Sequence, residues 1–292
     1  MGCVGGCVCK YDVADPDACI NAWIGKLWLG RPMSVCTITE SSMADVIDTS
    51  SAGDQRRPIA TPDLDAHIRI LVTGSNGLVG MAVREHAAKR LMSDDDDAQA
   101  KWFFAGSKDA DLRDRDATFA LFERVKPTHV LHLAAHVGGL FANMKYQVEF
   151  WRDNMAMQDN VFECCKEAGV KRLVSCLSTC IFPDGAPLPM NESIIMHGPP
   201  HFTNRGYAYA KRMVLMLGEL YNEQYGTNFA TVVPCNVFGK HDNFSISNGH
   251  VLPGLMHKCY LAKQRNEPFV IWGSGKPLCV FFDICLRFAG SF

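Results

Sequence analysis

A glycine-rich turn between an apolar strand and a helix constrains the fold of this chain more than any other feature. The apolar run at residues 68–73 predicts a buried strand, and residues 81–92 predict a helix. The turn between them has the pattern G-x-x-G-x-x-G and consists of Gly74, Ser75, Asn76, Gly77, Leu78, Val79 and Gly80. Glycines let the backbone approach a pyrophosphate, and the N–H groups that open the next helix favour an anion. The turn therefore predicts a dinucleotide site; a tight turn without a ligand is the alternative.

Strand and helix patterns alternate downstream of the turn. Apolar strands are predicted at 102–105, 130–135, 173–177 and 229–234, and helices at 117–125, 150–168 and 207–225. Such alternation is typical of right-handed βαβ units around a parallel sheet. We therefore predict an α/β chain with a Rossmann-like doubly wound parallel sheet.

The chain divides into three stretches by composition. Residues 1–67 mix Cys, Gly, Ser, Asp and Pro without periodicity, which predicts a disordered extension. Cys3, Cys7 and Cys9 lack a second pair at zinc-site spacing, so no metal is predicted. Residues 68–239 are predicted to form the cofactor-binding domain, and 240–292 part of a substrate domain.

Composition narrows the partners and the compartment. With a net charge of -2, the chain offers no general attraction for nucleic acid or an anionic membrane surface. No apolar run is long enough to span a bilayer, and no secretory signal precedes the fold. The 13 cysteines are therefore expected to be reduced thiols in a cytoplasmic protein.

The residues after the second strand bear on the choice of dinucleotide. An acidic group there suits the ribose 2′-hydroxyl of NAD, and a basic group suits the 2′-phosphate of NADP. Lys108 favours NADP, whereas the adjacent Asp109 leaves NAD open. A surface lysine without a ligand is the other interpretation of Lys108.

Three residues form a candidate site for carbonyl reduction. Tyr207 and Lys211 are four residues apart on a predicted helix and so share a face. A phenol with a pKa of about 10 is a poor acid–base group at neutral pH, and a nearby ammonium is expected to lower that pKa. Ser178 ends the fourth strand, at the edge where such sheets bind ligands. Together they predict proton donation by Tyr207 during hydride transfer from a nicotinamide.

Several further blocks carry a resemblance to one family. They are residues 133–139 (LAAHVGG), 175–183 (SCLSTCIFP), 236–244 (NVFGKHDNF), 248–253 (NGHVLP) and 271–275 (IWGSG). Together with the turn and the Tyr-x-x-x-Lys pattern, these blocks resemble the GDP-L-fucose synthases, which are extended short-chain dehydrogenases/reductases. The likeness covers roughly residues 68–278. It implies an NADP(H)-dependent homodimer that epimerises and then reduces a GDP-4-keto-6-deoxy sugar.

The resemblance also implies roles for individual residues. It makes Cys180 and His250 the proton-transfer pair for epimerisation, and a thiol with an imidazole suits that chemistry. Without the resemblance, a buried cysteine and a surface histidine are the simpler interpretations. Expected cofactor contacts include Ala134, Ala135, Pro234, Cys235, Asn236, Val237, His250 and Lys211, and expected substrate contacts are Lys258 and Trp272.

The chain departs from the family pattern at its end and at a few other positions. Cys279 stands where the family has an arginine suited to a pyrophosphate, and residues 279–292 are not expected to follow the family. His136, Cys235 and Lys240 are milder departures. Two alternatives therefore stay open: a catalytically silent NADP-binding subunit, and another nucleotide-sugar epimerase that cycles NAD.

Overall fold

Five parallel strands form the central sheet of a computed structural model that describes residues 68–90, 100–187, 189–271 and 281–283. The strands are β1 (Arg69–Thr73), β2 (Lys101–Ala105), β3 (His129–His132), β4 (Arg172–Cys176) and β5 (Phe229–Val232), and their order is β2-β1-β3-β4-β5. The expected α/β class and doubly wound parallel sheet are confirmed. Every predicted strand is present within a few residues, although the third ends at His132 rather than Ala135.

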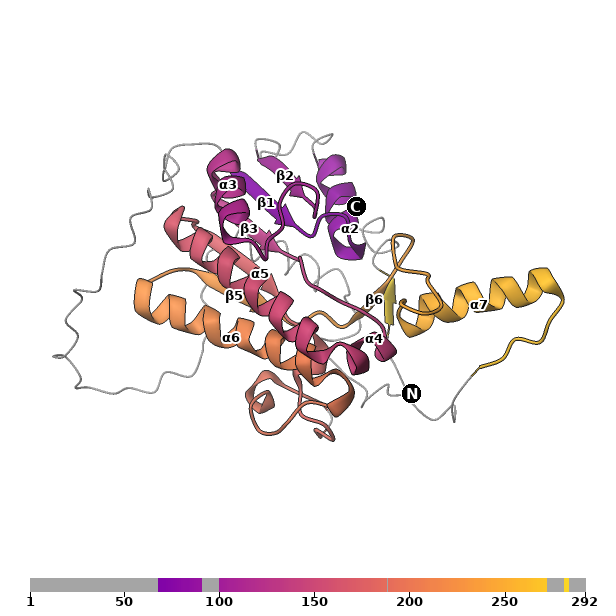
Figure 1. Cartoon of the computed structure of the whole chain (residues 1–292). Coiled ribbons are helices and arrows are strands. Elements are labelled where there is room, and N and C mark those ends of the chain that lie inside the picture. The colour runs from indigo at the N-terminus through magenta and orange to yellow at the C-terminus, as the bar shows by residue number, and fades with distance from the viewer. Residues whose placement is uncertain (1–67, 91–99, 188, 272–280, 284–292) are drawn as a thin grey trace.

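Helices cover both faces of the sheet (Figure 1). On one face lie α3 (Arg115–Val125), α5 (Gln147–Glu167) and α6 (Arg205–Tyr225), and on the other lies α2 (Leu78–Arg90). Successive strand residues point to opposite faces, so both must be apolar when both are covered. Leu71 accordingly packs on the α3–α5 side, while Ile70 and Val72 pack on the α2 side.

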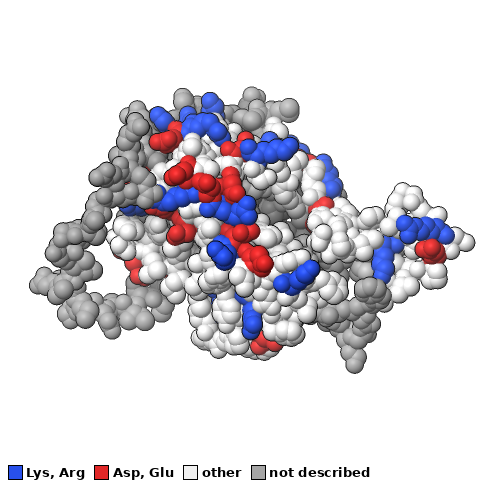
Figure 2. All heavy atoms as spheres, in the orientation of Figure 1, with Lys and Arg blue, Asp and Glu red and all other residues white. Residues whose placement is uncertain are grey.

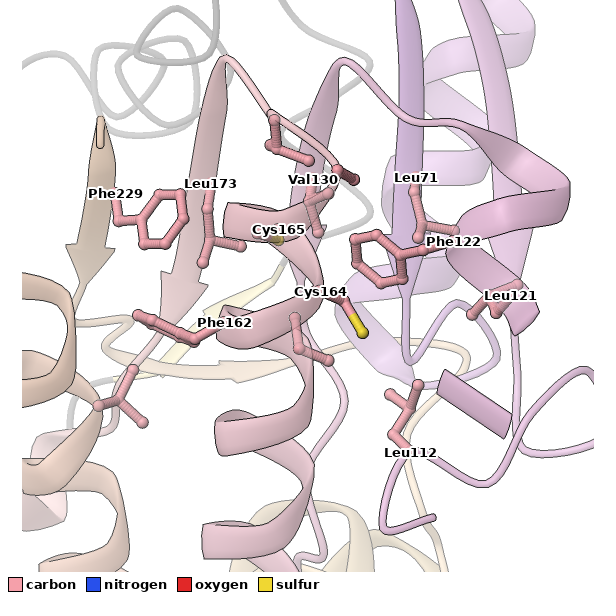
Figure 3. Close-up of a cluster of buried hydrophobic side chains, with 14 of the residues drawn as sticks. Leu71, Leu112, Leu121, Phe122, Val130, Phe162, Cys164, Cys165, Leu173 and Phe229 are labelled. Atoms are coloured by element: carbon pink, nitrogen blue, oxygen red, sulfur yellow. The ribbon is translucent and has the colours of Figure 1, made fainter. Parts of the chain in front are cut away.

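The larger core lies between the sheet and the helices α3 and α5 (Figure 3). Phe162 of α5 meets Phe229 of β5 edge-to-face, with ring centroids 5.5 Å apart. The neighbouring thiols of Cys164 and Cys165 are fully buried in the same cluster, where they act as small apolar groups. This core packs one face of the sheet against the helices.

Helices α5 and α6 pack side by side, and their amino-terminal ends meet at a glycine (Figure 1). A Cβ placed on Gly206 would lie 2.2 Å from the backbone oxygen of Gln147, so α6 can start against α5 only with glycine there. Further along, Gln158 Nε2 donates to the backbone oxygen of Ala210 at 3.0 Å. The pairing of the two helices places Tyr207 beside the amino-terminal half of α5.

A smaller unit follows the main sheet. Strand β6 (Asn236–Phe238) pairs in parallel with β7 (Phe281–Asp283), and α7 (Val251–Arg265) extends away from the sheet. The short helix α4 (Leu140–Lys145) precedes α5. Sequence analysis did not anticipate α4, β6 or α7. The predicted boundary near 239 and the departure from 279 stay predictions, and residues 1–67, Trp272 and Cys279 lie outside the described residues.

Candidate active site

The point where the strand order reverses lies between β1 and β3, since the chain leaves β1 for β2 on one side and later returns to β3 on the other. In open parallel sheets, ligands bind outside the carboxyl ends of the strands at such a point. The segments that meet there are the glycine turn after β1, the loop at 106–109 after β2, and residues 133–139 after β3. Residues 177–182 follow the next strand, β4.

In the glycine turn, backbone atoms lie in close contact with other backbone atoms. Gly74 has φ +68°, and a Cβ on it would lie 2.6 Å from the backbone nitrogen of Ala134. A Cβ on Gly80 would lie 2.5 Å from the carbonyl oxygen of Gly74. The turn is therefore possible only with glycine at these two positions, as expected for a backbone cradle that admits a phosphate.

The acidic residue of the loop after β2 forms a hydrogen bond within that loop. The Asp109 carboxylate accepts the Gly106 N–H at 2.8 Å, while the Lys108 side chain is exposed. The Asn76 amide covers Gly106, with Nδ2 only 2.3 Å from a Cβ built there. The Asp109 carboxylate therefore stabilises the turn, and the Lys108 side chain faces solvent.

A buried polar network not anticipated from the sequence supports this edge of the sheet. Ala134 N donates to Thr73 Oγ1 at 3.4 Å, and the same hydroxyl is hydrogen-bonded to His132 Nδ1 at 2.8 Å. Burial, and then the charge of Lys211, lower the pKa of His132 to about 3, so its imidazole is neutral. The only sign of this network in the sequence is that two apolar strands end in a polar residue, Thr73 and His132.

The structure brings Ser178, Cys180, Tyr207 and Lys211 together at the end of β4. Tyr207 and the Cys180 thiol both hydrogen-bond to Ser178, and Ser178 Oγ accepts the backbone N–H of Cys180 at 3.5 Å. Lys211 is buried, and its Nζ donates to the carbonyl oxygen of Cys176 at 2.9 Å. Four of the five predicted catalytic residues thus form one cluster.

The electrostatics of this cluster correct one expectation. Lys211 was expected to lower the pKa of Tyr207, but burial, followed by the nearby Cys180 and Cys176, raises it. The ammonium of Lys211 is directed at a backbone carbonyl, and desolvation lowers the pKa of Lys211 itself. Burial likewise raises the pKa of Cys180 to about 11. Both Tyr207 and Cys180 are therefore protonated at neutral pH.

An aromatic stack reaches Tyr207 from the loop after β3. The Phe150 ring meets Tyr207 edge-to-face with centroids 6.5 Å apart, and His136 stacks on Phe150 at 4.3 Å. His136 Nδ1 lies 2.9 Å from the Asp153 carboxylate, and the Asn154 amide binds both the N–H and the C=O of His136. From the sequence, His136 was only a departure from the family, whereas these contacts hold it beside Tyr207.

His250 lies at the rim of the site. It precedes α7, its side chain is exposed, and no hydrogen bond joins it to Cys180 within the described residues. The preceding backbone nonetheless approaches the loop after β3, because a Cβ on Gly139 would lie 3.0 Å from the oxygen of Gly249. Among the described residues, no hydrogen bond joins the predicted epimerisation pair, whose role stays a prediction.

The remaining predicted residues lie around the second small sheet. Pro234 and Cys235 connect β5 to β6, and Asn236 and Val237 begin β6. Glu85 of α2 anchors the next segment through Lys240 at 2.6 Å and His241 at 2.9 Å. Lys258 is half-buried on α7.

The part of the chain that the structure describes shows neither a metal-binding cluster nor a membrane-spanning helix. It contains no group of three or more His, Cys, Asp or Glu residues placed to hold a metal ion. None of its helices is long and apolar enough to cross a membrane.

The sequence of this chain is similar to those of known proteins. The model of the NAD dependent epimerase/dehydratase family matches residues 70–284. A GDP-L-fucose synthase of Dictyostelium discoideum is 52% identical over 212 residues, which are 73% of this chain and 65% of that protein. A probable GDP-L-fucose synthase of Drosophila melanogaster is 47% identical over 220 residues, or 73% of this chain and 67% of the relative. The chain thus spans about two thirds of the length of these relatives.

Solved structures agree with the sequence comparison. A crystal structure of a GDP-L-fucose synthetase from Naegleria fowleri bound to NADP has a TM-score of 0.69 and 48% identity. The match covers 80% of this chain and 75% of that one. A UDP-glucose 4-epimerase from Thermotoga maritima, at 19% identity and a TM-score of 0.57, shares the fold. This chain belongs to the NAD dependent epimerase/dehydratase family and is a relative of the GDP-L-fucose synthases.

Proposed function

We propose that this chain carries the NADPH-dependent epimerase and reductase activity that converts GDP-4-keto-6-deoxy-D-mannose to GDP-L-fucose. The observation that carries the proposal is the cluster of Ser178, Cys180, Tyr207 and Lys211 at the carboxyl edge of the sheet. Binding alone would not need a proton donor, a thiol and a buried ammonium in one place. The identity to proteins named GDP-L-fucose synthase supports the same substrate.

The residues present suit NADP(H) as cofactor. The glycine turn admits a phosphate at the amino end of α2, whose first turn contains no acidic residue. Lys108 is exposed after β2, and the carboxylate of Asp109 is held by Gly106 N–H. Residues 134, 135 and 234–237 would border the nicotinamide half, and Lys211 would hold the ribose hydroxyls. When bound, NADPH supplies the hydride for ketone reduction.

The resting protonation state of Tyr207 suits ketone reduction, in which the oxygen at C4 of the sugar takes up a proton. Tyr207 keeps its proton at neutral pH because burial raises its pKa, so it can donate that proton to the oxygen at C4 of the sugar. The Ser178 hydroxyl would hydrogen-bond the same oxygen. The raised pKa of Cys180, about 11, means that the thiol begins each cycle protonated. Epimerisation at C3 and C5 then requires His250 to move inward from the rim and share proton transfer with Cys180.

The experiment is turnover by the purified chain. We expect NADPH absorbance to fall in the presence of GDP-4-keto-6-deoxy-D-mannose, with GDP-L-fucose identified by chromatography. In Tyr207→Phe, kcat should fall by roughly 100- to 10,000-fold, the range for loss of a general acid. NADPH binding by Tyr207→Phe, followed by fluorescence, is the control for folding. Binding of NADPH by the wild-type chain with no turnover would refute the proposal.

One observation favours a second candidate, a catalytically silent NADP-binding subunit. The exposed position of His250, without a contact to Cys180, leaves the epimerisation pair unassembled in this structure. A silent subunit would bind NADPH and pair with an active copy. It would give no product alone, whereas the active enzyme gives product without a second polypeptide.

We further propose a homodimer formed through α5 and α6, acting in the cytoplasm. Exposed apolar side chains on these helices support a partner surface, namely Val148, Trp151, Met216 and Leu220. Charged side chains gather over α3 and α5, whereas the surface over α6 is mostly uncharged (Figure 2). The cysteines of the described residues are free thiols, as the reducing cytoplasm would keep them.

A further inference from the structure

We propose that Arg84 binds the 2′-phosphate of the cofactor's adenosine and so sets a preference for NADPH over NADH. The inference rests on the proposed use of NADP(H). Sequence analysis assigned this discrimination to Lys108, and Arg84 received no role.

Arg84 lies in the second turn of α2, and helical side chains lean toward the amino end of their helix. Its Nη2 accordingly reaches the Ser75 hydroxyl in the glycine turn, 3.3 Å away. Its Cζ lies 4.4 Å from the centre of the Phe104 ring. Phe104 belongs to β2, two residues before Gly106, so the guanidinium lies between the glycine turn and the carboxyl-terminal part of β2.

The electrostatics at this place call for an anion. The amino end of a helix carries a partial positive charge, and the first turn of α2 contains no acidic residue to offset it. Arg84 adds a full positive charge there and forms no ion pair with any described residue; its buried Nε has no hydrogen-bond partner among them either. The neighbouring Glu85 is engaged elsewhere, with Lys240 and His241. The amino end of α2 and the Arg84 guanidinium are both positive and lie close together, so a negatively charged ligand would stabilise them.

Position distinguishes the 2′-phosphate from the pyrophosphate. The N–H groups of the turn and of the first turn of α2 suit the pyrophosphate. Arg84 instead lies on the β2 side, over Phe104, and the residues after β2 are the ones that contact the 2′ position of the ribose. A guanidinium can bind a phosphate through two parallel hydrogen bonds, which a lysine cannot. Lys108 would then add a point charge from the exposed loop.

The test measures the dissociation constants of NADPH and NADH by fluorescence titration, without turnover. In Arg84→Gln, we expect the Kd of NADPH to rise by roughly 10- to 100-fold, the effect of losing hydrogen bonds to a charged group. The Kd of NADH should change by less than about 3-fold, because NADH lacks the phosphate. Arg84→Lys should show an intermediate loss, since it keeps the charge but not the paired hydrogen bonds. Lys89→Gln removes an exposed charge from the same helix and serves as the matched control.

Each other outcome overturns the inference. An equal loss for NADPH and NADH would assign Arg84 to the pyrophosphate or to the shape of the turn. Unchanged binding of both would leave discrimination to Lys108. If Arg84→Gln fails to fold, as judged by circular dichroism, the Arg84→Lys variant is the test. If its affinity for NADPH equals that of the wild type, Arg84 does not bind the phosphate through paired hydrogen bonds. A chain that binds NADPH in this pattern but turns over no sugar would contradict the proposed activity alone, and a wild-type chain that binds neither nucleotide would contradict both.

Discussion

Tyr207 and Cys180 owe their protonation states to burial. Both groups hydrogen-bond to Ser178, and for both the loss of water around the charged form is the largest cause of the raised pKa. A phenol that stays protonated can deliver a proton during reduction but is a poor base. This protonation state suits the proposed ketone reduction, and any use of the Cys180 thiolate requires a further stabilising charge from ligand or protein.

His132 makes a prediction at the residue scale. Its folded-state pKa of about 3 lies below the ordinary value of 6.5, so below pH 6.5 the unfolded chain takes up a proton that the folded chain refuses. The stabilisation is fully present above that pH and is lost as pH falls toward 3. From pH 7.5 to 5.5, the free energy of unfolding of the wild type should fall by about 1 kcal/mol more than that of His132→Asn.

Urea unfolding of both proteins at the two pH values measures this difference. The comparison cancels the contribution of His129, whose pKa burial also lowers, because both proteins retain it. Parallel pH profiles for the two proteins would show that His132 is not held neutral in the fold.

Helix α6 shows how one close backbone contact positions Tyr207, the proposed proton donor. Gly206 precedes Tyr207 directly, and a Cβ on Gly206 would meet the Gln147 backbone at 2.2 Å. A backbone atom cannot move aside as a flexible side chain can, so the start of α6 must shift when that Cβ is added. The helix–helix contact and the reach of Tyr207 are therefore coupled.

At the element scale we expect Gly206→Ala to lower the free energy of unfolding by about 1–3 kcal/mol, the usual cost of overpacking. We also expect kcat to fall, because Tyr207 moves with the start of the helix. Gly218→Ala is the matched control in the same helix, since the nearest atoms to its Cβ lie at 3.7 Å and 3.8 Å, ordinary contact distances. Urea unfolding and initial rates measure both effects. Equal behaviour of the two variants would show that the α5–α6 contact is tolerant at this point.

At the scale of the whole molecule, the outer surface of α5 and α6 is the feature that suggests assembly. Leu220 is 50% exposed and Trp151 is 37% exposed, on helices that pack against each other. A charge introduced into an apolar interface is costly to desolvate. Leu220→Glu should therefore convert a dimer to a monomer.

Light scattering after size-exclusion chromatography measures the mass of each species. Tyr260→Glu, at an exposed position on α7, should keep the dimer and serves as the control. A wild-type chain that elutes as a monomer, or a Leu220→Glu variant that stays dimeric, would reject the proposed interface.

The sequence by itself determined the parts of this protein that follow from local pattern. The glycine turn between strand and helix, the alternation of strands and helices, and the i, i+4 placement of Tyr207 and Lys211 depend on residues near one another in the chain. The helix α7 escaped notice because its apolar residues do not form one clear stripe.

Only the tertiary structure decided what depends on burial and on contacts between distant segments. The hydrogen bond between Thr73 and His132 joins residues 59 positions apart, so no sequence pattern could indicate it. The rise in the pKa of Tyr207 is the clearest case: spacing placed Lys211 on the same helix face, but folding directed its ammonium to the Cys176 carbonyl. Desolvation then exceeded the attraction that spacing alone had suggested, because the loss of water depends on every element packed around the phenol.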